Sequence, residues 1–172
     1  MKITFSEIEA GKSSYEFDVE PAEMRFDFPD AQFQQRVKAA VRAFASGDEI
    51  IIDGTVETSA IMECSRCLAD FEIKLKAPVK LIIQRNDEMQ DDDTGDENFD
   101  IVSKSVNEYD LAPYCREQLL VELPNKPLCS EDCEGLCPVC GGNLNETHCD
   151  CSIESDSGHW EKLREIFKGG NS

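Results

Sequence analysis

The alternation of apolar and polar residues between Phe71 and Ile83 constrains the fold of this chain more than any other feature. Every odd position in this run carries an apolar side chain, a period of two that a helix cannot produce. An earlier run, from Ile50 to Cys64, also places its apolar residues on one face of an extended segment. Gly54, in the middle of that run, predicts either a bulge or a close approach of a neighbouring strand. Both runs are predicted to be long strands.

A short turn separates these two predicted strands, the segment Cys64-Ser65-Arg66-Cys67. Because a connection this short joins antiparallel neighbours, the runs are expected to form one hairpin with Cys64 and Cys67 at its tip. Two further short strands joined by a turn are predicted near the N-terminus, around Ile3 and around Phe17.

Residues 30–46 fit two patterns. Apolar residues from Phe33 to Phe44 recur at helical spacing, with Asp30 as N-cap and Gly47 beyond the end, and this pattern taken alone favours a helix. The same segment also alternates as a strand would, through Val37, Ala39, Val41 and Ala43.

A helix is predicted from Leu111 to Leu123, with Asp110 as N-cap and Pro113 in its first turn. Cys115 lies on the apolar stripe of this helix and is interpreted as a core residue. A second, short helix is predicted from Trp160 to Phe167. The fold class is therefore α+β, an antiparallel β-sheet with two helices and a small Cys-rich C-terminal appendix stabilised by zinc. The predicted parts are a core domain over 1–124, the appendix over 125–152, and a helix and tail over 153–172.

Charge and composition limit the functions of the chain. The 172 residues carry a net charge of −19, which repels phosphate and anionic membranes. A nucleic-acid contact therefore needs a local basic surface or a protein partner. Residues 86–100 hold eight acidic residues and no basic one, a composition that predicts a flexible loop. The chain shows neither an apolar run of about 20 residues nor a secretory h-region, so a cytoplasmic location with reduced cysteines is expected.

The stretch from Leu128 to Cys151 contains six of the nine cysteines. Its centre, Cys137-Pro-Val-Cys140-Gly-Gly, has the spacing of a tight turn that directs two sulfurs at one ion. Thiolates favour Zn²⁺ over the oxygen-seeking Mg²⁺ and Ca²⁺. Apart from Cys115, the cysteines are all candidate zinc ligands: Cys64, Cys67, Cys129, Cys133, Cys137, Cys140, Cys149 and Cys151.

These eight cysteines can be divided in two ways. In one, Cys64 and Cys67 join a pair from the C-terminal stretch, which makes two complete four-cysteine sites. In the simpler one, a single zinc binds Cys137, Cys140 and two other cysteines of that stretch, and this arrangement is favoured. The spacing does not identify the remaining pair.

Three motifs occur in an order that resembles a known family. They are Cys64-Ser-Arg-Cys67-Leu68 after a long strand, the helix EYDLAPYCREQLLVELP, and the segment PLCSEDCEGLCPVCGGNLNETHCDC. Together they resemble the bacterial YceD family of large ribosomal RNA subunit accumulation proteins, which has plastid relatives. The resemblance implies a role in accumulation or processing of large-subunit ribosomal RNA, no enzymatic activity, and a strand from about Arg36 to Ser46.

The function expected on this basis is that of a non-enzymatic ribosome-biogenesis factor. The alternative is a zinc-dependent protein-interaction adaptor outside ribosome biogenesis. A thiol redox function is disfavoured because the Cys64–Cys67 motif joins two strands, whereas redox motifs of the thioredoxin type precede a helix. The expected partner is ribosomal RNA or a ribosomal protein, contacted through Lys74, Lys76, Lys80 and Arg66; cross-strand pairing of these cations with Asp53, Glu57 and Glu72 is the competing interpretation. Neither a membrane nor a small-molecule substrate is expected.

Overall fold

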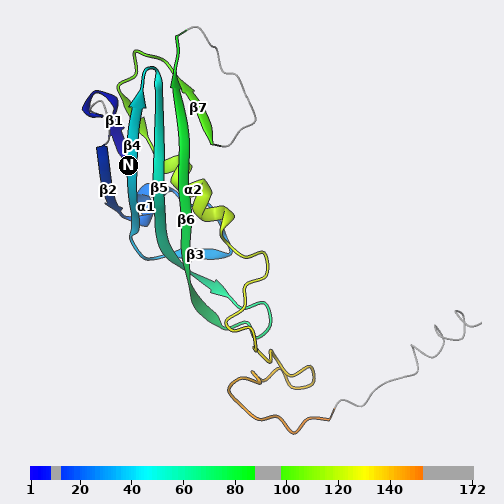
Figure 1. The fold of residues 1–172 in the computed structure, drawn as a ribbon. Coiled ribbons are helices and arrows are strands. Elements are labelled where there is room, and N and C mark those ends of the chain that lie inside the picture. Colours follow the sequence, from blue (N-terminus) through cyan, green and yellow to red (C-terminus); the bar gives the residue numbers. More distant parts are fainter. Residues whose placement is uncertain (9–12, 88–97, 153–172) are drawn as a thin grey trace, which may run out of the picture. The chain divides into compact units, whose positions relative to one another are not determined.

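The computed structural model describes residues 1–8, 13–87 and 98–152 (Figure 1). The chain forms two compact units, one made of Met1–Ser65 and Ala69–Cys129, the other of Arg66–Leu68 and the chain from Ser130 onward. The elements of the first unit, in chain order, are β1 (Lys2–Thr4), the short helix η1 (Phe5–Glu7), β2 (Ser13–Val19), α1 (Pro21–Met24), β3 (Ala31–Phe33), β4 (Val37–Ser46), β5 (Glu49–Glu63), β6 (Asp70–Arg85), β7 (Phe99–Val102), β8 (Glu108–Asp110) and α2 (Ala112–Val121).

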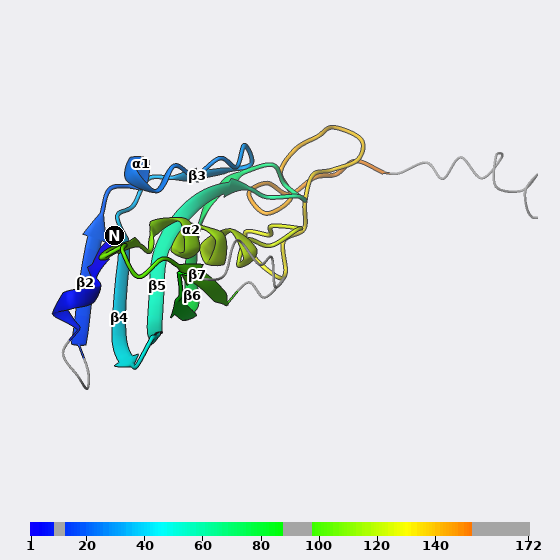
Figure 2. The ribbon, with the colours of Figure 1, turned by 90° about the horizontal axis from the view of Figure 1, so that it is seen from above.

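The main sheet has six strands, in the order β2-β4-β5-β6-β7, with β3 paired to the end of β5. Neighbouring strands are antiparallel except β6 and β7, which are parallel. The helix α2 packs against β5 and β6 and covers one face of the sheet (Figure 2). The predicted α+β class with an antiparallel sheet is confirmed, with a parallel strand at one edge. The two N-terminal strands also form, but β1 pairs with β8 in a separate two-stranded sheet while β2 pairs with β4.

The hairpin predicted around the Cys64–Cys67 turn is confirmed. β5 and β6 pair without interruption from Glu49 opposite Gln84 to Glu63 opposite Asp70. Gly54 marks a close approach rather than a bulge, because a Cβ there would overlap the carbonyl oxygen of Ala40 and lie 2.6 Å from the Cα of Val41. The apolar positions of both strands are buried on the face that α2 covers, from Ile50 to Met62 on β5 and from Leu75 to Ile83 on β6.

The helical interpretation of residues 30–46 is wrong, and the strand implied by the family resemblance is confirmed. β4 lies between β2 and β5, so both of its edges are hydrogen-bonded, and Val37, Ala39, Val41 and Ala43 all point into the core. Pairing on two sides outweighs a helical pattern built mainly from alanine, valine and phenylalanine.

The helix predicted after Asp110 is also confirmed, although its N-cap is Leu111 rather than Asp110 and it is shorter than predicted. α2 begins at Ala112, whose N–H donates to the Asp110 carboxylate at 3.0 Å, and it ends at Val121. Cys115 is 0% exposed in the core, as expected, and burial raises the pKa of its thiol to about 12. The four-residue helix α1 was not predicted; its first turn is closed by a reciprocal capping box between Glu20 and Glu23.

Part of the predicted acidic loop is ordered. Asp87 accepts hydrogen bonds from Ser103 and Lys104, and the loop prediction is wrong for Phe99 and Asp100, which begin β7. Residues 88–97 and the predicted C-terminal helix lie outside the described residues. No helix in the described part of the chain is long and apolar enough to cross a membrane.

Candidate metal centres

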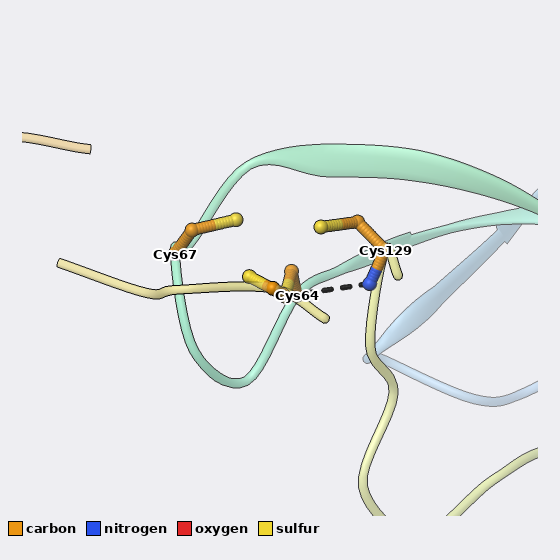
Figure 3. Close-up of side chains that lie close together, drawn as sticks. Cys64, Cys67 and Cys129 are labelled. Carbon is orange, nitrogen blue, oxygen red and sulfur yellow. Dashed lines mark hydrogen bonds between the residues drawn. The ribbon is translucent and has the colours of Figure 1, made fainter. Parts of the chain in front are cut away.

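The first group of cysteines consists of Cys64, Cys67, Cys129 and Cys133, whose sulfur atoms all lie within 4.8 Å of one another. Figure 3 shows the first three of these side chains directed toward a common point. All but Cys129 are buried.

Local backbone geometry holds this group in place. The N–H of Cys64 donates to the Ala69 carbonyl at 2.9 Å, which closes the hairpin turn. Leu68, directly after the second cysteine of that turn, adopts a left-handed conformation with φ of 58°. The Cys129 N–H donates to the Cys64 sulfur at 3.4 Å (Figure 3), so a backbone donor already points at the position where negative charge develops on a thiolate.

The second group consists of Cys137, Cys140, Cys149 and Cys151, again with all sulfurs within 4.8 Å. The Cys149 sulfur lies 3.4 Å from that of Cys137 and 3.6 Å from that of Cys140. Four sulfurs around a tetrahedral ion with bonds of about 2.3 Å lie about 3.8 Å apart, so the spacing matches such a site. Gly141 follows the second cysteine of the turn with φ of 72°, which parallels Leu68 in the first group.

The titration behaviour of the second group fits a cation at its centre. The backbone N–H groups of Cys140 and Val139, together with the Cys149 thiol, lower the pKa of Cys137 to about 6. In contrast, hydrogen bonding to Cys149 and Cys140 raises the pKa of Cys151 to about 12. Four adjacent thiols cannot all ionise, because the negative charge of each thiolate disfavours ionisation of its neighbours. A bound cation removes this conflict and favours four thiolates.

The described part of the second unit, Arg66–Leu68 and residues 130–152, has no apolar core of its own. Among its described residues the buried side chains are all cysteines: Cys67, Cys133 and Cys137. Val139 is 57% exposed, and Leu136 and Leu144 are only half-buried. A cysteine-rich segment with so little apolar burial among its described residues needs another source of folding energy, and metal ligation supplies it in small cysteine-rich domains.

Two polar side chains near Cys133, a member of the first cysteine group, hold its sulfur and its loop in position. The Asn145 amide donates to the Cys133 sulfur at 3.4 Å and accepts from the Glu134 N–H at 2.9 Å. The Arg66 guanidinium donates to the carbonyls of Glu131 at 3.1 Å and Cys133 at 2.9 Å. Asn145 orients a sulfur and Arg66 fixes the loop that carries it, as polar groups around metal ligands commonly do.

The structure thus brings all eight predicted ligands into two groups of four. Cys64 and Cys67 join Cys129 and Cys133, while Cys149 and Cys151 join the Cys137 turn. Either group could hold a metal ion. Each has four sulfur ligands, enough to complete tetrahedral coordination without leaving a position for water.

Three of the four basic residues predicted to contact RNA lie on the sheet face opposite α2, and the fourth, Arg66, lies in the turn between β5 and β6. Lys74, Lys76 and Lys80 are exposed on β6. Lys76 is opposite Glu57, with 4.0 Å between Nζ and Oε2, and Lys80 is opposite Asp53.

The neighbouring strands repeat this alternation of charge. On β4, Arg42 pairs with Asp53, and just before β4, Arg36 pairs with Asp18 and Glu20. Columns of basic residues therefore alternate with columns of acidic residues across the face, which weakens its attraction for phosphate. The cross-strand pairing foreseen as the competing interpretation is present for Asp53 and Glu57, whereas Glu72 accepts a hydrogen bond from Ser59.

Comparison with known proteins identifies the family. The YceD family, described as large ribosomal RNA subunit accumulation protein YceD, matches residues 52–167. The chain belongs to the YceD family. The matched range contains all eight cysteines of the two groups.

Individual relatives are distant. The uncharacterized protein YlbN of Bacillus subtilis is 30% identical over 134 residues, which cover 74% of this chain and 73% of YlbN. An uncharacterized protein of Mycobacterium tuberculosis is 28% identical over 136 residues, covering 74% of this chain and 60% of the relative. The chloroplastic large ribosomal RNA subunit accumulation protein YCED homolog 1 of Zea mays is 26% identical over 168 residues, covering 83% of this chain and 57% of the relative. The chain thus spans about 60% of the length of the mycobacterial relatives it matches. No solved structure matches the chain.

Proposed function

We propose that this protein is a non-enzymatic factor that supports accumulation or processing of large-subunit ribosomal RNA in the cytoplasm. The observation that carries the proposal is the YceD match over residues 52–167, which includes the hairpin, α2 and both cysteine groups. The description of that family and the name of the maize relative both refer to accumulation of the large ribosomal RNA subunit.

Each cysteine group binds one structural Zn²⁺ in this proposal. Four sulfurs within 4.8 Å suit a tetrahedral, thiolate-seeking ion. Binding of the ions to the thiolates contributes free energy to the folding of the cysteine-rich unit. With four sulfur ligands, each ion has no open position for a reacting water. This is the physical reason for assigning the sulfurs to structure rather than catalysis.

In this proposal the contact with the ribosome is made to a protein rather than to bare RNA. Each basic column on the open face of the sheet has an acidic column beside it, and Arg66 donates to backbone carbonyls. Lys74, Lys76 and Lys80 can still contribute at the edge of a ribosomal surface, but the net charge of −19 favours a basic protein partner.

Sedimentation of the tagged full-length protein in lysates from its own host tests the proposal. We expect it to co-migrate with precursors of the large subunit at moderate salt. A variant with Cys137→Ser and Cys140→Ser should lose this association, while the matched control Cys115→Ala should keep it. Absence of the wild type from every ribosomal fraction, together with a stable partner outside the ribosome in pull-downs, would instead establish an adaptor function.

A further inference from the structure

A groove of about 650 Å³ lies in the first unit, between the segment leading into β3 and the segment that follows α2. These two segments can be followed from the labels of β3 and α2 in Figure 1. Most of its exposed lining is polar, and apolar side chains, including Phe28, Leu120 and Pro127, form the smaller part; the first two are half-buried against the core. The groove therefore offers apolar surface that the protein's own core does not fully cover.

Three carboxylates line the same groove: Asp30, Glu63 and Asp70. All three are exposed, and Glu63 lies directly opposite Asp70 in the β5–β6 register. Like charges in opposing positions destabilise a sheet, so this pair carries a cost within the isolated chain. Lysine, arginine and histidine are absent from the lining.

These carboxylates differ from others on the sheet in their ion-pair partners. Asp18, Glu20, Asp53 and Glu57 each face a lysine or arginine within ion-pair distance. By contrast, the described residues provide no ion pair and no side-chain hydrogen bond for the three carboxylates of the groove. The groove thus combines apolar surface with negative charge that is left uncompensated in the folded chain.

We propose that this groove binds a basic, extended polypeptide segment of a partner protein, one that carries apolar side chains among its lysines and arginines. The apolar side chains enter between Phe28 and Leu120, while the cations neutralise Glu63 and Asp70. Charge complementarity selects this occupant, since the carboxylates would repel the phosphates of RNA and the headgroups of an anionic membrane. An acidic or neutral peptide would leave the opposed carboxylates without compensation.

Binding of a basic segment in the groove is inferred from the residues that line it and does not depend on the proposed function. Only the identification of the partner as a ribosomal protein rests on that function. Binding of a synthetic peptide and sedimentation with ribosomal precursors are separate measurements. Failure of either one therefore leaves the other result standing.

Fluorescence anisotropy with the full-length protein and a labelled peptide rich in lysine, arginine and leucine tests the inference. Two comparison peptides replace the leucines by serine or the cations by glutamate, and a labelled single-stranded RNA serves as the competing ligand. The test variant is Glu63→Gln with Asp70→Asn. The matched control is Glu16→Gln with Glu49→Gln, which removes the same charge from exposed positions outside the groove.

We expect the basic apolar peptide to bind the wild type, and both comparison peptides to bind at least several-fold more weakly. The groove variant should weaken binding about fivefold, as expected for two exposed ion pairs, and the control should change it less than twofold. An equal loss of peptide affinity in both variants would show that the peptide is attracted by the net charge of the protein alone, and it would overturn the inference. Serine-substituted peptide that binds as well as the original, or RNA that binds more tightly than the peptide, would also overturn it.

Discussion

Cys115 provides a quantitative test of the division of nine cysteines into eight ligands and one core residue. Its side chain is 0% exposed on α2, and it belongs to neither cysteine group. Replacing it by alanine removes one buried sulfur and leaves a small cavity. We expect Cys115→Ala to lower the free energy of unfolding by about 1 kcal/mol at pH 7.

The pH dependence of this difference follows from the shifted pKa. Burial raises the pKa of Cys115 from 9.0 to about 12, so the folded state keeps the thiol protonated while the unfolded state releases its proton above about pH 9. The contribution of the thiol is fully present below pH 9 and is lost as the pH rises toward 12. At pH 10, one unit above the unfolded pKa, the wild type should lose about 1.4 kcal/mol that the alanine variant does not lose. The stability difference between the two proteins should therefore fall through zero, leaving the alanine variant more stable by about 0.4 kcal/mol at pH 10.

Urea unfolding of both proteins, followed by circular dichroism at pH 7, 8, 9 and 10 with constant zinc, measures this difference. Other groups titrate over the same range, but they are common to both proteins and cancel. A difference that stays near 1 kcal/mol from pH 8 to pH 10 would mean that the thiol ionises equally in the folded state. That result would refute the assignment of Cys115 to the core.

Three further outcomes are expected. Gly54→Ala should cost about 2 kcal/mol of unfolding free energy, because its Cβ would overlap the Ala40 carbonyl, and unchanged urea melting would contradict the close approach of the two strands. Asn145→Ala should weaken metal retention about tenfold in chelator competition, since it removes the donor to the Cys133 sulfur; equal retention would show that this hydrogen bond is irrelevant to the ion. Chelation of all metal should abolish protease resistance within residues 130–152 while the far-ultraviolet signal of the sheet persists, and a protease-resistant metal-free segment would argue that packing alone holds it.

The sequence was most informative where one side-chain pattern admits one structure. Seven apolar odd positions between Phe71 and Ile83 cannot occupy one face of a helix, and the hairpin followed from them with its tip correctly placed. Between Val37 and Phe44 the pattern admits two structures, because the same apolar residues satisfy both periods. Pairing of β4 with strands on both sides decides between them, and a local window contains no information about such pairing.

The sequence named all eight candidate ligands and allowed two groups of four, but it favoured a single site and did not identify which pair lies beside Cys64 and Cys67. Cys64 and Cys67 are separated from Cys129 by more than 60 residues of chain, and only the fold brings their sulfurs together. The groove shows the same limitation, because Asp30 is more than 30 residues away in sequence from Glu63 and Asp70, which flank one hairpin turn. Spacing motifs identify ligands that are close in sequence, whereas long-range sets require the topology.

The metal content of the full-length protein, purified without chelators and measured by elemental analysis, tests the central claim most directly. We expect two zinc ions per chain. One ion should remain in Cys64→Ser with Cys67→Ser, one in Cys137→Ser with Cys140→Ser, and two in Cys115→Ala. A wild-type chain with no metal, or with a single ion that persists when Cys64 and Cys67 are both replaced, would contradict the account of two four-cysteine sites.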